Sequence, residues 1–217
     1  MDLAAIYKAR FEETGLQKRN SVWSVLCRDF FNPLIGEQKD ILDVACGYGE
    51  FINNVSARSK SAIDLNPDAK KYLSPTVRFF LCPATAMTVA DASQDAVFTS
   101  NFLEHLPTKA DCDAVFSEVF RVLRPGGRFI ILGPNIKYAY REYWDFYDHY
   151  IPLSHLSLAE GLQQSGYEVV RNIPRFLPFT MKSRKPTSDI AVSTYLRLPI
   201  IWPIFGKQFL VVAKRPH

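Results

Sequence analysis

The pattern of apolar and polar residues changes at Gly36. Before this glycine, Val22, Val25, Leu26 and Phe30 recur at helical spacing, so the first forty residues are predicted to be mainly helical. After it, short apolar runs alternate with helical patterns. The runs predict strands at residues 41–45, 61–64, 77–82, 96–100, 128–132, 168–173 and 208–213.

The predicted helices lie between these strands. Residues 111–123 place apolar side chains on one stripe, and the Pro-Gly-Gly at 125–127 is predicted to end this helix and turn into the next strand. Another helix is predicted at 157–165, with Gly166 in the position of a C-terminal glycine. Alternating strands and helices predict an α/β fold with a mostly parallel sheet covered on both faces. No composition shift marks a boundary, so residues 1–217 are predicted to form a single domain.

A strand followed by a glycine-containing turn is the strongest local signal. In residues 41–51 a buried strand leads into a loop with Gly47 and Gly49, which allow a ligand to approach the backbone. The next strand ends at Asp64, whose carboxylate can accept hydrogen bonds from both hydroxyls of a ribose. In doubly wound sheets, ligands bind at the carboxyl ends of the strands. A dinucleotide fingerprint needs a third glycine where Ile52 stands, so the pattern argues against a nicotinamide cofactor.

Four stretches resemble class I S-adenosylmethionine-dependent methyltransferases, in the order and spacing of that family. They are DVACGYG (43–49), AIDLNP (62–67), DAVFTSNFLEHL (95–106) and RVLRPGGRFIILGPN (121–135). The resemblance covers residues 36–173 and the last strand, and it extends to uncharacterised bacterial members of the family. It implies a doubly wound, Rossmann-like sheet of seven strands, mostly parallel with the last strand antiparallel. It also implies S-adenosylmethionine as the cofactor.

The resemblance also implies which residues hold the cofactor. They lie at the ends of the first four strands: Asp43, Ala45, Gly47, Tyr48, Gly49, Phe51, Asp64, Leu65, Ala84, Thr85, Asn101 and Phe102. Ala45 replaces a glycine found in many members and is expected to be harmless. Cys82 and Pro83 stand where many members have an acid that receives the adenine amino group. The adenine is therefore expected to lie against backbone groups near residues 84 and 85.

The leading segment, residues 1–35, resembles the helical lid that often covers the cofactor in this family. It contains Tyr7, Arg10 and Phe11. Arg10 either meets the carboxylate of the cofactor or is a solvated residue of an amphipathic helix. Two further segments, 136–156 and 174–206, are expected to lie on the acceptor side of the sheet.

Methyl transfer needs positioning and, for a hydroxyl acceptor, a base that removes the proton. By resemblance, the turn with Asn101, Glu104 and His105 lies beside the transferred methyl group. His105 is the first candidate base and His149 the second, with Asp145 or Asp148 as a partner of His149. The aromatic segment 136–156 is either a wall of the acceptor pocket or scaffold. No tight ligand spacing is present, so no metal is predicted.

Composition narrows the choices further. The four cysteines form no Cys-x-x-Cys pair, and the N-terminal residues are too charged for a signal peptide, which favours a cytoplasmic protein. No apolar run is long enough to cross a membrane. Residues 171–217 hold nine Lys and Arg residues and one acid. This charge suits an anionic acceptor or peripheral membrane contact, although a solvated basic face remains an alternative.

These observations predict a methyltransferase acting on a small-molecule or carrier-linked acceptor, most simply at oxygen. An N- or C-methyltransferase and a non-catalytic cofactor-binding partner subunit remain the alternatives. Nucleic-acid methylation is disfavoured, because neither an NPPY-like tetrapeptide nor a separate recognition domain is present. The sequence leaves the acceptor and the oligomeric state open.

Overall fold

The computed structural model describes residues 13–179 and 188–217. Its centre is a sheet of seven strands in the order β3-β2-β1-β4-β5-β7-β6. The strands are β1 (Asp40–Val44), β2 (Ser59–Asp64), β3 (Val77–Leu81), β4 (Gln94–Ser100), β5 (Leu123–Pro134), β6 (Glu168–Ile173) and β7 (Gln208–Lys214). Strands β1 to β5 pair in parallel, while β7 pairs antiparallel with both β5 and β6. The predicted fold class is confirmed.

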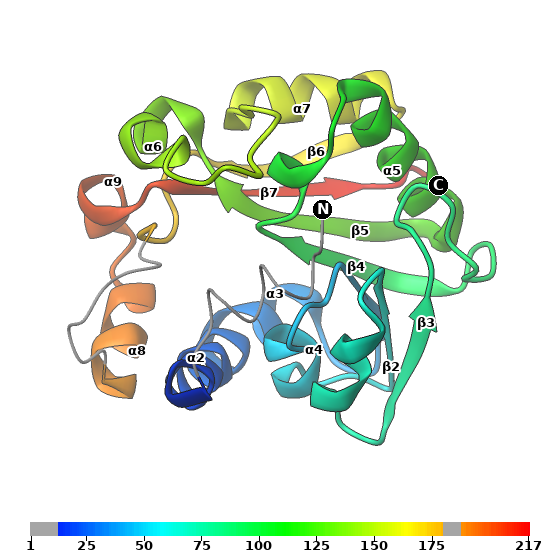
Figure 1. Cartoon of the computed structure of the whole chain (residues 1–217), viewed down its shortest axis with the longest axis horizontal. Coiled ribbons are helices and arrows are strands. Elements are labelled where there is room, and N and C mark those ends of the chain that lie inside the picture. The colour runs from blue at the N-terminus through cyan, green and yellow to red at the C-terminus, as the bar shows by residue number, and fades with distance from the viewer. Residues whose placement is uncertain (1–12, 180–187) are drawn as a thin grey trace.

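Helices cover both faces of this sheet (Figure 1). One layer contains α5 (Lys109–Val122) and α7 (His155–Gln164), and α6 (Ile136–Tyr143) lies beside α7. The other contains α2 (Glu13–Leu26), α3 (Asn32–Ile35), α4 (Glu50–Asn54) and α8 (Asp189–Arg197). Shorter helical turns are η1 (Cys27–Phe31), η2 (Pro67–Tyr72), η3 (Leu103–His105), η4 (Pro199–Ile201) and α9 (Trp202–Phe205).

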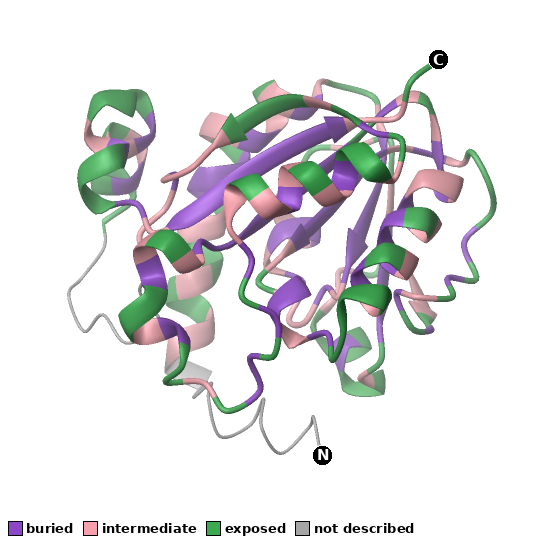
Figure 2. Ribbon diagram, turned by 90° about the horizontal axis from the view of Figure 1, so that it is seen from above, coloured by how far each residue is buried: buried purple, intermediate pink, exposed green. Residues whose placement is uncertain are grey.

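The central strands are buried on both faces, and the outer faces of the helices are exposed (Figure 2). Because side chains alternate along a strand, neighbouring residues of β1 enter different cores: Ile41 packs with α2 and α4, and Leu42 with α5. An aromatic cluster joins the leading helices to the sheet, with Phe31 5.2 Å from Phe98 and Phe51 stacked 3.7 Å from the same ring. This cluster supports the turn that follows β1.

The predicted boundaries of several elements change in the structure, by the largest number of residues at the start of β5. Helix α5 ends at Val122, and β5 begins at Leu123, so the Pro-Gly-Gly lies within the strand and not in a turn before it. The reason is long-range pairing: Gly126 donates to the carbonyl of Arg215, and Arg215 donates to Gly127. Helix α7 begins two residues before the predicted start and ends before Ser165. Gly166 has a φ of 88°, which confirms its role after the helix.

Among the helices of residues 13–179 and 188–217, none combines the length and the apolar character needed to cross a bilayer. The four cysteines are all buried free thiols.

A charged network fixes the start of β1. The carboxylate of Asp40 accepts hydrogen bonds from Arg58, from Ser59 at 2.8 Å and from Arg124 at 2.9 Å. Hydrogen bonding to Arg58, more than any other cause, holds the pKa of Asp40 well below its usual value. The charged carboxylate therefore stabilises the fold above the pKa of an unfolded aspartate, near 4.

We expect Asp40→Asn to lower the free energy of unfolding at pH 7 by about 1–2 kcal/mol, allowing for the exposure of Arg58. Because the folded pKa is depressed, the wild type loses this contribution as the pH falls below about 4, and the two proteins converge. Urea unfolding at a series of pH values measures the gap. A gap that stays constant down to pH 2.5 would contradict the assignment.

Candidate functional site

The turn after β1 is built from residues in the left-handed region of φ. Ala45, Gly47 and Gly49 have φ values of 56°, 53° and 72°. At Gly49 a Cβ atom would lie 2.5 Å from the Cδ2 atom of Leu73, so a larger residue would have to displace the Leu73 side chain as well as adopt a positive φ. Ala45 tolerates its φ at a cost of about 1 kcal/mol. The loop is thus held in a tight conformation at the carboxyl end of a central strand.

Asp64 ends β2 beside this loop. Its Oδ2 atom accepts a hydrogen bond from the amide of Gly47 at 2.9 Å, and its Oδ1 atom accepts one from Asn66 at 2.8 Å. Burial raises the pKa of Asp64, and the backbone amides oppose that shift. Each carboxylate oxygen has a second lone pair, so Asp64 can also accept hydrogen bonds from hydroxyl groups of a ligand.

Asp43 lies beneath the loop. It is buried in β1, and its carboxyl accepts a backbone hydrogen bond from Ile52. Burial, with smaller contributions from Glu50 and Asp64, raises its pKa well above the usual value. The side chain therefore braces the loop against α4, and a contact with the cofactor by Asp43 stays a prediction.

Arg19 of α2 reaches over the same loop, which the sequence did not indicate. Its Nε atom lies 2.9 Å from Oε1 of Glu50, and its guanidinium lies 5.3 Å from the ring centre of Tyr48. Tyr48 also contacts Tyr72 edge to face at 4.6 Å. An arginine on a helix has no sequence pattern around it that would predict a contact with a distant loop. Tyr7, Arg10 and Phe11 lie outside the described residues.

The remaining predicted cofactor residues differ in exposure. Phe51 is buried in the aromatic cluster, so its side chain serves packing, and Phe102 is half-buried against the core. Leu65 and Asn101 are exposed where β2 and β4 end, and Asn101 has a φ of 48°. Ala84 and Thr85 follow β3, buried and half-buried respectively. All of them except Phe51 lie in turns at the carboxyl edge of the sheet.

His105 lies in η3, just after β4. Its Nδ1 atom is 2.9 Å from the carbonyl oxygen of Asp148 and 3.2 Å from Oδ2 of the same residue. A carbonyl oxygen can only accept a hydrogen bond, so Nδ1 carries the hydrogen in the neutral ring and Nε2 is left as an acceptor. The sequence paired Asp148 with His149; the structure shows that the Asp148 carboxylate lies against His105.

Long-range backbone bonds create this pairing. The amides of Tyr150 and Ile151 donate to the carbonyl of Glu104 at 2.8 and 3.3 Å, tying the segment after α6 to η3. The ring of His149 is 4.9 Å from that of His105 and stacks on Phe146 at 4.8 Å. The two candidate histidines are therefore brought together.

Glu104, which the sequence analysis placed in the same turn without giving it a role, completes the cluster. Its side chain is buried, and burial raises its pKa. Glu104, His105 and His149 each offer one ligand atom, and these atoms lie within 4.8 Å of one another, so the three residues could hold a metal ion. The prediction of no metal stays a prediction.

His155 belongs to a different environment. Its Nδ1 atom lies 2.9 Å from Nδ2 of Asn135, and its ring stacks on Tyr138 at 6.5 Å. Burial, followed by the nearby Lys137, lowers its pKa. His155 therefore connects α7 to the end of β5 and is not part of the histidine cluster.

The strands that carry this site match a known family of domains. Residues 42–131, from β1 to β5, match the model of a methyltransferase domain. Over this stretch the chain is similar to S-adenosylmethionine-dependent methyltransferases. S-adenosylmethionine is the cofactor that this similarity supports.

Similar proteins include several kinds of methyltransferase. A malonyl-[acyl-carrier protein] O-methyltransferase of Hahella chejuensis is 35% identical over 104 residues, which are 44% of this chain and 36% of the relative. A ubiquinone/menaquinone biosynthesis C-methyltransferase of Nitrobacter hamburgensis is 31% identical over 106 residues, covering 42% of this chain and 41% of the relative. The chain thus spans less than half the length of these two curated relatives.

Solved structures extend the likeness in fold to most of the chain. A SAM-dependent methyltransferase from Archaeoglobus fulgidus superposes with a TM-score of 0.67 at 19% identity, covering 90% of this chain and 94% of that one. At this identity the comparison shows a shared fold alone.

Proposed function

We propose that this chain is an S-adenosylmethionine-dependent methyltransferase and that it transfers the methyl group to an oxygen atom of a small-molecule or carrier-linked acceptor. The observation that supports oxygen is the His105–Asp148 pair, with Nδ1 of the ring engaged at 2.9 Å and Nε2 left to accept a proton. A weakly acidic hydroxyl must lose its proton near the transition state, whereas a neutral amine can attack without a base. A histidine held in this tautomer is therefore most useful to a hydroxyl acceptor.

The residues around the turn after β1 suit the cofactor. Asp64 has lone pairs for the ribose hydroxyls, and the left-handed Gly47 and Gly49 leave backbone open to a ligand. We assign the adenine of the cofactor to the turn at Ala84 and Thr85. We assign the end of the cofactor that carries the transferred methyl group to Asn101 and Phe102. We also propose that the leading segment acts as a lid, because Arg19 already contacts Tyr48 and Glu50.

When bound, S-adenosylmethionine supplies an electrophilic methyl group and leaves as a neutral thioether. In our proposal Nε2 of His105 takes the hydroxyl proton. The Asp148 carboxylate, 3.2 Å from Nδ1, then compensates the positive charge of the ring. His149 lies against His105 and orients the acceptor from the other side. We also propose that the reaction takes place in the cytoplasm.

An acceptor screen tests this function. The protein is incubated with labelled S-adenosylmethionine and with hydroxyl, amine and activated-carbon acceptors of matched size, and products are identified by mass and fragmentation. Transfer to hydroxyl oxygen is the expected result. Transfer confined to nitrogen or carbon would overturn oxygen as the methylated atom. Binding of S-adenosylmethionine without transfer to any acceptor class would favour a partner subunit.

A further inference from the structure

Large exposed apolar side chains gather between β6 and β7. Five of them lie in a segment of nineteen residues, 188–206, and we call these five the apolar patch: Ile190 (78% exposed), Leu198 (44%), Ile200 (82%), Ile204 (65%) and Phe205 (57%). Exposed apolar groups that occur singly need no explanation, whereas five within one short segment make that segment a candidate contact surface.

The apolar patch is held on an anchored scaffold. Trp202 is buried, 4.9 Å from the ring of Phe176, and its Nε1 atom donates to the carbonyl of Tyr195 at 2.9 Å. Arg175 donates to the carbonyls of Gly206 at 2.7 Å and Ile204 at 3.0 Å. The same short segment therefore turns Trp202 into the core and leaves Ile200, Ile204 and Phe205 exposed. Their exposure is a feature of the fold and not the result of loose packing.

The stretch of sequence that contains the patch has a positive net charge. Residues 171–217 contain nine Lys and Arg residues and one acid, Asp189. The carboxylate of Asp189 accepts a hydrogen bond from the hydroxyl of Ser21 at 2.5 Å. Arg197 is exposed at the end of α8 beside the patch. Lys182, Arg184 and Lys185 belong to this basic stretch of the sequence but lie outside the described residues.

Two exposed aromatic residues lie at the C-terminal end of α6. Tyr140 and Trp144 are 55% and 58% exposed. Helix α6 is joined to the start of β7 by the Glu142–Lys207 ion pair, and α6, α9 and α8 follow one another along one end of the molecule (Figure 1). Tyrosine and tryptophan favour the boundary between water and lipid, because their rings are apolar at one end and polar at the other.

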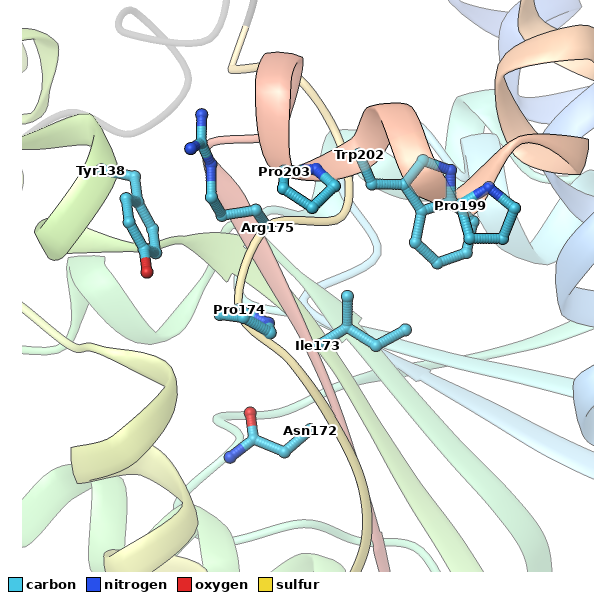
Figure 3. A pocket seen from close by; sticks show the side chains of 8 residues that line it. All are labelled: Tyr138, Asn172, Ile173, Pro174, Arg175, Pro199, Trp202 and Pro203. Carbon is cyan, nitrogen blue, oxygen red and sulfur yellow. The ribbon is translucent and has the colours of Figure 1, made fainter.

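A groove of about 470 Å³ opens next to the patch (Figure 3). Pro199, Trp202 and Pro203 form one wall, and Ile173, Pro174 and Tyr138 lie across from them. Arg175 passes 4.8 Å from the ring centre of Tyr138. The groove lies at the β6 end of the sheet, at the edge where β5 ends and β7 begins, and not beside the loop after β1.

We propose that the apolar patch docks on the surface of an anionic lipid bilayer. Apolar and aromatic side chains inserted among head groups, with basic residues beside them, are the two contributions on which peripheral membrane binding depends. A second copy of this chain suits the surface less well, because a symmetric contact would bring the two basic regions together. The consequence for the acceptor, which rests on the proposed function, is a lipid-bearing hydroxyl compound presented at the membrane.

Vesicle sedimentation tests the docking without cofactor or acceptor. The full chain is mixed with vesicles of phosphatidylcholine containing phosphatidylglycerol, and with vesicles of phosphatidylcholine alone, at low and high salt. We expect binding to the anionic vesicles that weakens with salt. The triple variant Ile200→Ser, Ile204→Ser, Phe205→Ser should bind at least about tenfold more weakly. Arg197→Glu should weaken binding at low salt.

The matched control is Leu81→Ser with Val170→Ser, two residues that are also exposed but lie on the edge strands β3 and β6. The control should bind vesicles like the wild type, and thermal melting should show that every variant is folded. Equal sedimentation of the triple variant and the wild type would overturn the proposal. The proposal would also be overturned if light scattering showed a dimer of the wild type that the triple variant does not form, and if the wild type did not bind vesicles.

The same proteins are then assayed with a water-soluble hydroxyl acceptor found in the screen. If transfer to hydroxyl is retained and no vesicle binding is seen, the membrane-docking proposal is wrong and the proposed oxygen transfer still holds. If vesicles are bound as expected and hydroxyl acceptors are not methylated, the proposed oxygen transfer is wrong and the membrane-docking proposal still holds. The two hypotheses therefore give separate results.

Discussion

Replacing His105 with alanine is expected to lower the turnover number with a hydroxyl acceptor by roughly 10²–10⁴. The dissociation constant of S-adenosylmethionine should stay nearly unchanged, because the imidazole contacts Asp148 and His149 and not the turn after β1. Single-turnover kinetics and calorimetric titration measure the two quantities. The loss follows from removing the atom that takes the hydroxyl proton.

Two further variants sharpen this test. Asp148→Asn should also lower turnover, by a smaller factor, and should change the pH dependence of turnover, because it alters the group that holds Nδ1. His149→Ala tests the second candidate base. His217→Ala is the matched control, since His217 is exposed at the opposite edge of the sheet beside Gly126. Full activity of both the His105 and His149 variants would mean that the enzyme works by positioning alone.

Asp64→Ala should weaken binding of S-adenosylmethionine by about 1.5–3 kcal/mol, or roughly 10- to 150-fold. The alanine removes the expected acceptor for the ribose hydroxyls and also the partner of the Gly47 amide. Asp64→Asn keeps one oxygen acceptor and should lose less affinity. Calorimetric titration gives the dissociation constants.

The control for this series is Asp68→Ala, which removes an exposed carboxylate a few residues further along the chain that pairs only with Lys71 among the ion pairs of the described residues. It should bind the cofactor like the wild type. Thermal melting of each variant shows whether the turn after β1 is still formed. An unchanged dissociation constant in a folded Asp64→Ala protein would show that Asp64 does not bind the ribose. Micromolar binding of NAD, with no binding of S-adenosylmethionine, would overturn the cofactor assignment.

The strands and the sheet could be predicted because their signals are local. Each apolar run of β1, β4 and β7 is buried on both faces, so it is visible in the sequence without reference to any partner. The start of β5 could not be predicted, because its pairing with Arg215 lies ninety residues away in the chain and overrides the turn tendency of Pro-Gly-Gly.

The turn after β1 was also visible locally. Gly47 and Gly49 stand where φ is positive, and a side chain at Gly49 would also have to displace the end of the Leu73 side chain. Backbone requirements of this kind select glycine directly, so the sequence records them. Ala45 shows the limit of that signal, because alanine adopts the same conformation at a small cost.

The sequence by itself determined the strand pattern, the glycine turn, Asp64 at the end of the next strand and the two candidate histidines. Tertiary structure decided that Asp148 holds His105, that Glu104 lies beside both histidines and that Arg19 covers Tyr48. It also decided that Trp202 enters the core while Ile200 and Ile204 remain exposed. The physical reason is the range of the interactions: period and turn geometry act within a few residues, whereas contacts between distant segments depend on how the helices pack on the sheet.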